Sequence, residues 1–253
     1  MIEIKGLKAG YENHKVLDIE KICFEEGKIS GIFGLNGSGK STLLKAIIGL
    51  VKRNEGEIYI DGKNISQFNH RARAREIAYL PQSFPVAAMD VETLVNHGRY
   101  AHLGYSKVLS KKDRELIDYA LNLTDLAGKR TKALGSLSGG ERQRAYLAMV
   151  IAQDTKYLFL DEATSSLDIK PQIEFYKVLS RLADQGHGII ITSHDLPQAF
   201  SFCDEINVLF SGKVILSGKA DDIIKSRKLK EGMGINLKKT DDRDLLYKYG
   251  LCE

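Results

Sequence analysis

Gly34-Leu35-Asn36-Gly37-Ser38-Gly39-Lys40-Ser41-Thr42 is the stretch that decides the fold of this chain. A glycine, four residues and then Gly-Lys-Ser is the spacing of a loop that wraps around phosphate groups. Small residues let the backbone curl so that successive N–H groups point at phosphate oxygens, and the start of a helix adds partial positive charge. We expect Lys40 to reach the terminal phosphates of a nucleotide and the Ser41 hydroxyl to bind Mg²⁺.

The residues on either side of this loop support that interpretation. Lys28 to Phe33 is an apolar run typical of a buried strand, and Thr42 to Ile48 has helical periodicity. A strand, a loop and a helix therefore follow one another in the order that a phosphate-binding loop requires. A glycine-rich turn that binds nothing is the alternative, and this context disfavours it.

A second candidate element is a strand that ends in two acids. Residues 157–160 are Tyr-Leu-Phe-Leu, and Asp161 and Glu162 follow them. Consecutive apolar residues suit a strand covered on both faces of a parallel sheet, and ligands gather at the carboxyl ends of such strands. We expect Asp161 to act on Mg²⁺ through a water and Glu162 to polarise the water that attacks the γ-phosphate. Taken alone, this segment would be an ordinary acidic turn.

A third motif, Leu137-Ser138-Gly139-Gly140-Glu141, lies in the middle of the chain. Ser138 and Glu141 have the spacing of a capping box, so a helix is expected to begin at Ser138. The two glycines would let another backbone or a phosphate come close. By itself the pattern predicts only a helix cap.

Followed by Arg142-Gln143-Arg144, this string resembles the signature sequence of ATP-binding cassette (ABC) proteins, and the chain resembles that family from about residue 1 to about residue 222. The resemblance implies an α/β fold, a P-loop NTPase cassette with a mixed or parallel core sheet, an N-terminal antiparallel β subdomain and an inserted α-helical subdomain. We place the RecA-like core and β subdomain at 1–82 and 156–222, the helical subdomain at 83–155, and a tail of unassigned role at 223–253.

The resemblance also implies further site residues. It places Tyr11 against adenine, makes Gln82 a contact of Mg²⁺ that senses the partner, and assigns His194 to the γ-phosphate as a catalytic residue. Without the family, ordinary packing, solvation and a structural role would be the respective interpretations. The predicted nucleotide-binding residues are Tyr11, Gly34, Leu35, Asn36, Gly37, Ser38, Gly39, Lys40, Ser41, Thr42, Gln82 and Asp161, of which Ser41, Gln82 and Asp161 are the predicted Mg²⁺ contacts.

Two further segments follow the Asp-Glu pair. Ser166, Leu167 and Asp168 correspond to the family's loop that crosses to the other subunit, although Asp168 could equally cap the helix that carries Pro171. The family generally has proline after the Asp-Glu pair, whereas this chain has Ala163. Alanine leaves the turn that aims Glu162 more freedom than proline would, which bears on the hydrolysis rate and not on nucleotide binding.

The remaining pattern predicts the surrounding elements. Alternating and apolar runs predict strands at 2–4, 16–19, 57–60, 188–192, 206–210 and 214–217, the first three in an antiparallel sheet and the last two in a hairpin. From about residue 83 to 155 the character is helical, with Ser110 as one helix cap. No internal repeat is evident, so we expect one cassette.

Composition narrows the class of protein. The chain has 253 residues, 43% of them hydrophobic, and no apolar run approaches the length of a membrane span, so we do not expect it to cross a membrane by itself. Three cysteines without a C-x-x-C spacing disfavour a disulfide framework or a zinc site and suit a reducing cytosol. The net charge of +4 does not indicate nucleic acid, and the basic cluster Arg71 to Arg75 is expected to be a solvated helix face.

The resemblance implies an ATPase that works as a homodimer. A second copy, docked head to tail, would close the bound ATP with Ser138, Gly139 and Gly140. The expected partners are membrane permease subunits, which would dock near Gln82 to Val91, and, indirectly, an extracytoplasmic substrate-binding protein. The chain would then be a peripheral protein on the cytoplasmic face of the cell membrane.

Three segments resemble the ATPases of iron-siderophore, haem and cobalamin importers, namely 96–104, 151–155 and 166–169. Iron chelate is the favoured cargo, and the permease is not identified. The alternative is a soluble cassette ATPase that serves as a scaffold, such as the iron–sulfur assembly type. A chromosome-maintenance or translation cassette would need a long coiled-coil insertion or a second cassette, and guanine nucleotides would need an Asn-Lys-x-Asp motif; the sequence contains none of these.

Overall fold

The strand that precedes the phosphate loop lies in the middle of a six-stranded sheet. In the computed structural model, which describes residues 1–11, 14–84, 86–104, 108–194, 200–226, 235–239 and 247–251, the strand order is β10-β9-β3-β8-β7-β6. The strands are β3 (Ile29–Phe33), β6 (Ile77–Leu80), β7 (Tyr157–Asp161), β8 (Gly188–Ser193), β9 (Glu205–Phe210) and β10 (Lys213–Gly218). All neighbours pair in parallel except β9 and β10, which form the predicted hairpin. The carboxyl ends of β3, β7 and β8 therefore share one edge.

A second sheet is antiparallel and has the order β2-β1-β4-β5. Its strands are β1 (Ile2–Tyr11), β2 (His14–Phe24), β4 (Arg53–Ile60) and β5 (Lys63–Asn64). Ile2 and Ile4 are buried and pair with residues of both β2 and β4, so alternate side chains of β1 face the interior. The predicted antiparallel sheet is confirmed.

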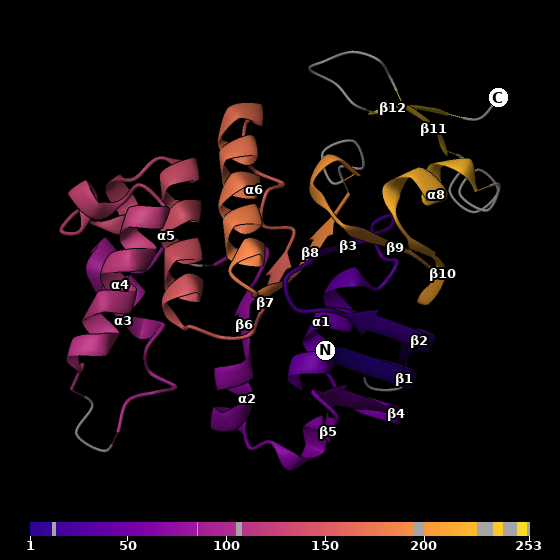
Figure 1. The fold of residues 1–253 in the computed structure, drawn as a ribbon, viewed down its shortest axis with the longest axis horizontal. Helices are drawn as coiled ribbons and strands as arrows, with labels where there is room; N and C mark the ends of the chain where they lie inside the picture. Colours follow the sequence, from indigo (N-terminus) through magenta and orange to yellow (C-terminus); the bar gives the residue numbers. More distant parts are fainter. Residues whose placement is uncertain are drawn as a thin grey trace.

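The helices form one group of three at one end of the molecule, with the others beside the sheets (Figure 1). They are α1 (Lys40–Ile48), α2 (His70–Glu76), α3 (Val91–His97), α4 (Lys111–Leu123), α5 (Gly139–Ala152), α6 (Ile169–Asp184) and α8 (Ala220–Lys225), with 3₁₀ turns η1 (Ile65–Gln67), η2 (Ala127–Lys129) and η3 (Leu134–Ser136). Figure 1 shows α3, α4 and α5 gathered on the left, the antiparallel strands on the lower right and α6 between them. The predicted α/β cassette, with its helical segment and antiparallel sheet, is confirmed.

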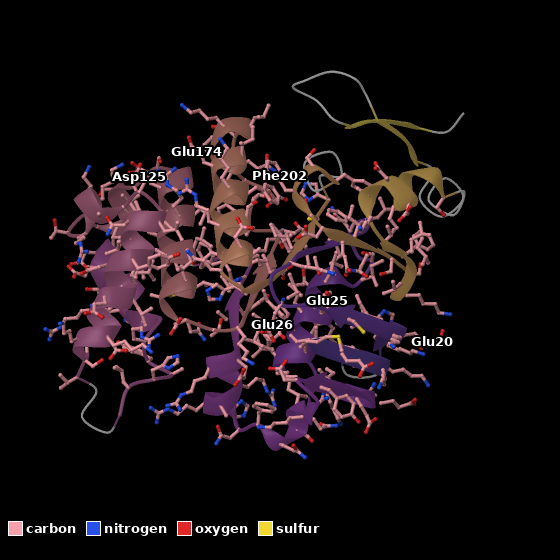
Figure 2. All side chains as sticks on the ribbon, in the orientation of Figure 1. Glu20, Glu25, Glu26, Asp125, Glu174 and Phe202 are labelled. Carbon is pink, nitrogen blue, oxygen red and sulfur yellow. The ribbon has the colours of Figure 1, made fainter. Side chains whose placement is uncertain are left out.

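Strand β7 separates two hydrophobic cores. Its side chains alternate, so that Leu158 and Leu160 join the core beneath α3 to α6, whereas Tyr157 and Phe159 join the core formed with α1 and the antiparallel sheet. Phe202, labelled in Figure 2, adds to the first core by stacking near Tyr176 of α6, with ring centroids 4.7 Å apart. A strand buried on both faces is held rigidly, and so is the acidic turn at its end.

Capping boxes begin two helices of the helical segment. Ser110 accepts the backbone N–H of Asp113 at the start of α4, and Ser138 accepts that of Glu141 at the start of α5, with each acid bonding back to the cap. Both predicted caps are confirmed. The boxes satisfy backbone N–H groups that a helix start would otherwise leave unpaired.

The basic cluster of α2 is more than a solvated face. Arg71 and Arg75 each donate through Nε to the carbonyl oxygen of Ala101 at 2.9 Å, and Arg73 donates to the carbonyl oxygen of Ile48 at 2.9 Å. Arg71 and Arg75 are exposed, as predicted for a solvated face, whereas Arg73 is half-buried. They tie α2 to the end of α1 and to the segment that follows α3.

Two other features differ from the sequence-based expectation. The tail from residue 223, to which no pattern was assigned, contains an antiparallel hairpin of β11 (Ile235–Lys239) and β12 (Tyr247–Leu251). The strand β6 was also not predicted, whereas α2 coincides with the helix expected at the basic cluster. Within the described residues, no helix is both long and apolar enough to cross a bilayer.

Candidate nucleotide site

The loop after β3 leads directly into α1. Gly39 is the N-cap of α1 and has φ 105°, a left-handed conformation that glycine adopts without strain. A side chain at Gly34 would come within 2.2 Å of the carbonyl oxygen of Leu209, so only glycine fits there. The start of α1 faces the loop and carries the positive end of the helix dipole.

Lys40 points back across this loop. Its side chain is 4% exposed, and its Nζ donates to the carbonyl oxygen of Gly34 at 2.9 Å and lies 3.4 Å from Oε1 of Glu162. Ser38 beside it has a buried hydroxyl without a hydrogen-bond partner among the described residues. A buried ammonium group and an unpaired hydroxyl beside glycine N–H groups suit an anionic ligand.

Asp161 ends β7 inside a hydrogen-bond network. Its Oδ1 accepts from the hydroxyls of Ser41 and Thr192, each at 2.8 Å, and its Oδ2 accepts from Tyr79 at 3.0 Å. The carboxylate is 1% exposed. Burial, together with the negative charge of Asp161, raises the pKa of Tyr79, which keeps this phenol protonated as a donor.

Glu162 projects from the next position with a strained backbone. Its φ is 47°, in the left-handed region that non-glycine residues rarely adopt. Its carboxylate accepts from Nε2 of Gln82 at 2.8 Å and lies 3.7 Å from Nδ1 of His194. Residues that follow β3, β6, β7 and β8 thus meet at the shared carboxyl edge of the sheet.

Lys40, Gln82, Glu162 and His194 line one cavity of about 630 Å³, whereas Asp161 lies behind it, bonded to the lining residue Ser41. Its lining residues are Val16, Asn36, Gly37, Gly39, Lys40, Ser41, Thr42, Gln82, Glu162, Ser165 and His194. Most of the residues predicted to bind nucleotide or act in catalysis therefore converge. Tyr11 is not among the lining residues and is half exposed at the end of β1, as is Leu35 in the loop.

The Leu137–Glu141 motif does not line this cavity. Ser138 and Gly139 are exposed at the start of α5, and a Cβ on Gly139 would meet nothing within 4 Å. Gly140 lies against Leu167 and Pro171, so the motif packs beside the segment 166–168. Asp168 occupies the N-cap position of α6, yet its side chain makes no capping hydrogen bond.

Comparison with known proteins identifies the family. The family model described as ABC transporter matches residues 17–165, more than half of the chain. The chain belongs to the ABC transporter family. It is an ATP-binding cassette ATPase.

Individual relatives agree with this assignment. The cassette is 37% identical over 234 residues to the petrobactin import ATP-binding protein YclP of Bacillus subtilis (strain 168), covering 91% of this chain and 92% of the relative. It is 35% identical over 233 residues to the iron(3+)-hydroxamate import ATP-binding protein FhuC of the same organism, covering 91% and 86%. The crystal structure of an ATP-binding cassette of an ABC transporter in its ADP conformation shares the fold, with a TM-score of 0.81, 22% identity and coverage of 91% and 97%.

The cassette fits Mg²⁺ bound with a nucleotide. Ser41 and Asp161 supply a hydroxyl and a carboxylate oxygen on facing elements, 2.8 Å apart, and such oxygens are typical ligands of this ion. Among the described residues, no cluster of three or more His, Cys, Asp or Glu side chains could hold a metal ion without other ligands. Magnesium sites that also use substrate phosphates need only one or two protein oxygens.

Tyr79 and Thr192 are site residues that sequence reasoning missed. Both are polar residues near the carboxyl ends of the largely apolar strands β6 and β8, and both donate to Asp161. Polar side chains near the carboxyl ends of parallel strands were a usable signal, because Thr192 is in register with Asp161 in the sheet.

Proposed function

We propose that this cassette hydrolyses ATP to energise a membrane importer of iron chelates. The observation that carries the proposal is the convergence of Lys40, Gln82, Glu162 and His194 on one cavity, with Asp161 bonded to Ser41 of its lining. Phosphoryl transfer requires a cation that binds the phosphates, oxygen atoms that bind a metal ion and a carboxylate that orients the attacking water. Cargo of the iron-siderophore type is supported by the names of the relatives, and haem or cobalamin is the less favoured cargo.

In the proposed mechanism, Lys40 binds the terminal phosphates, and Gln82 and His194 keep Glu162 oriented. Glu162 accepts a proton as the oxygen of a water forms a bond to the γ-phosphorus, and the bond between that phosphorus and the bridging oxygen of ADP breaks. Inorganic phosphate and ADP leave. Mg²⁺, held by Ser41 and Asp161 with Gln82 nearby, would offset the negative charge of the phosphates.

A second copy of the chain completes the proposed site. Ser138, Gly139 and Gly140 would contact the nucleotide held by the partner, with the segment 166–168 alongside. The exposure of Ser138 and Gly139 supports this arrangement, because a surface that closes on a neighbouring molecule must be accessible in one chain. Binding of ATP would join the two copies, and release of phosphate would separate them.

The proposed membrane partners are permease subunits that dock near residues 82–91. Val86, which is 52% exposed, supports an apolar contact there. The chain would act as a peripheral subunit on the cytoplasmic face of the membrane. An extracytoplasmic binding protein would deliver the chelate to the permease.

Reconstitution tests this function. The cassette is combined in proteoliposomes with the permease encoded beside its gene, and ATP hydrolysis and uptake are measured with a ferric siderophore, haem or cobalamin loaded on the binding protein. We expect permease-stimulated hydrolysis and uptake of the ferric siderophore, both lost in Glu162→Gln. A rate of ATP hydrolysis that does not change with the permease but increases with a soluble protein complex would instead support a scaffold ATPase.

A further inference from the structure

The backbone of Glu162 needs support from its surroundings. A φ of 47° is unfavourable for a residue with a side chain, and this conformation aims the carboxylate toward Gln82 and Lys40. The following residue is Ala163, which lacks the ring by which proline would fix φ and restrict the turn. Neighbouring groups must therefore hold the turn in place.

Thr192 contacts this turn with a single hydroxyl. Its Oγ1 accepts the backbone N–H of Glu162 at 2.8 Å and donates to Oδ1 of Asp161 at 2.8 Å. The direction of each bond is fixed, because a backbone N–H can only donate and a carboxylate can only accept. Thr192 is fully buried, so water does not replace either bond.

Other bonds hold the rest of the turn. The backbone N–H and the hydroxyl of Ser165 donate to the carbonyl oxygen of Glu162 at 3.1 and 2.9 Å, and Nε2 of Gln143 donates to the carbonyl oxygen of Ala163 at 2.7 Å. Those bonds restrain the end of the turn. Of these bonds, only those of Thr192 join the N–H of Glu162 to the carboxylate of Asp161.

We propose that Thr192 is a positioning residue for ATP hydrolysis. Its hydroxyl fixes the left-handed backbone of Glu162 relative to Asp161, so that the proposed base and the proposed Mg²⁺ carboxylate keep one geometry. The inference rests on the proposed role of Glu162. It assigns to β8, which ends just before His194, a function in aiming the base.

Thr192→Val tests the inference because it removes the hydroxyl and keeps the shape. We expect kcat to fall by about 10- to 100-fold, with the KM for ATP changed less than about threefold, since small misplacement of a reacting group has effects of this size. Thr192→Ser keeps a hydroxyl and should restore kcat to within about threefold of wild type. Thr124→Val removes an equally buried hydroxyl, which donates to the carbonyl oxygen of Ala120 in α4, and should leave kcat unchanged.

A second readout does not depend on turnover. With ATP and Mg²⁺, Thr192→Val should accumulate as a nucleotide-bound dimer in light scattering, because binding persists while hydrolysis slows. If Thr192→Val does not fold, Thr192→Ala creates no overpacking and takes its place. Wild-type kcat in a folded variant without the hydroxyl would overturn the proposal.

Two controls separate this inference from the proposed function. If Glu162→Gln remains active, the role of Glu162 is wrong; if it is inactive while Thr192→Val has wild-type kcat, only the positioning role is wrong. The double variant should be no slower than Glu162→Gln alone, because Thr192 acts through Glu162. A third result would also overturn the proposal. If Thr192→Val needs over about tenfold more Mg²⁺ for activity but recovers the full kcat at saturating Mg²⁺, the hydroxyl orients only Asp161 and not Glu162.

Discussion

Lys40 and Glu162 meet at the centre of the site, where their Nζ and Oε1 atoms lie 3.4 Å apart with side chains 4% and 10% exposed. Salt screens such a pair less than a surface pair. In the proposed mechanism, a triphosphate that binds Lys40 would compete with Glu162 for the same ammonium group. Glu162, the proposed base, would then keep Gln82 and His194 as neighbours, so one lysine would link nucleotide binding to the orientation of the base.

Glu162→Gln tests the base at the level of a single side chain. The variant keeps the size of the residue but cannot accept a proton, so hydrolysis should fall by about 10²- to 10⁴-fold while ATP still binds. Titration with a fluorescent ATP analogue and light scattering should report a trapped dimer. Glu20→Gln, an exposed site on β2, should behave as wild type. A Glu162→Gln protein that stays monomeric with ATP and Mg²⁺ would contradict the assignment.

At the scale of elements, Arg99 holds the helical segment together. Its Nε donates to Oδ1 of Asp113 at 2.8 Å, and its Nη1 donates to the carbonyl oxygens of Ala152 and Gln153 at 2.8 and 3.2 Å. These contacts join the segment after α3 to the start of α4 and to the end of α5. A guanidinium group at the end of α5 also complements the negative end of that helix dipole.

Asp113→Ala should destabilise this segment strongly. It leaves Arg99, which is 3% exposed, without its carboxylate, and removing one partner of a buried pair costs about 3–5 kcal/mol of the free energy of unfolding. Chemical denaturation measures the loss. Glu115→Ala breaks the exposed pair with Lys111 on the same helix and should cost less than about 0.5 kcal/mol. Equal effects would show that Arg99 and Asp113 do not act as a buried pair.

The same pair predicts a pH dependence. Burial raises the pKa of Asp113, but hydrogen bonds from Ser110 and Arg99 outweigh burial and lower it to about 2 from an ordinary value of 3.8. Since the folded-state pKa is the lower one, the stabilisation is complete above about pH 4 and disappears as the pH falls toward 2. The difference in free energy of unfolding between wild type and Asp113→Asn should therefore shrink over that range. A difference that does not change with pH would contradict the shifted pKa.

The elements that could be predicted were those with a local signal. The phosphate loop, the acidic turn and both capping boxes each have a characteristic spacing, and the predicted strands and caps were found. Thr192 and Tyr79 were missed because their bonds to Asp161 depend on strand order and register, which no local pattern encodes. The hydrogen bonds of the three arginines of α2 were missed for a related reason, because the carbonyl groups that they bind belong to other elements.

At the scale of the whole molecule, the signature turn and the cavity are separate surfaces of one chain. Ser138 and Gly139 are exposed and do not line the cavity that contains Lys40 and Glu162. Two-fold symmetry would bring the turn of each copy to the cavity of the other. In a two-fold interface, every contact that one copy makes with its partner is repeated by the partner. The proposed dimer thus contains two equal composite sites.

Ser138→Arg tests the composite site. Each chain should still bind ATP, while the long cationic side chain should block the one site that it faces in the partner, so that hydrolysis is lost at both sites of the homodimer. The substitution also removes the cap of α5, so Ser110→Arg, which removes the matching cap of α4, is the control: it should lose about 1 kcal/mol of stability and keep full activity. Normal hydrolysis by Ser138→Arg would exclude a site shared between chains.

Mixing two inactive variants decides whether the site is shared. Lys40→Ala lacks the phosphate cation and Ser138→Arg lacks the closing turn, so each homodimer has two defective sites. A mixed dimer has one site in which Lys40 and Ser138, from different chains, are both intact. Random pairing makes half of the dimers mixed, and each has one complete site of two, so activity should return to about a quarter of wild type. If both groups acted on a nucleotide within one chain, mixing would restore nothing, because neither chain has both.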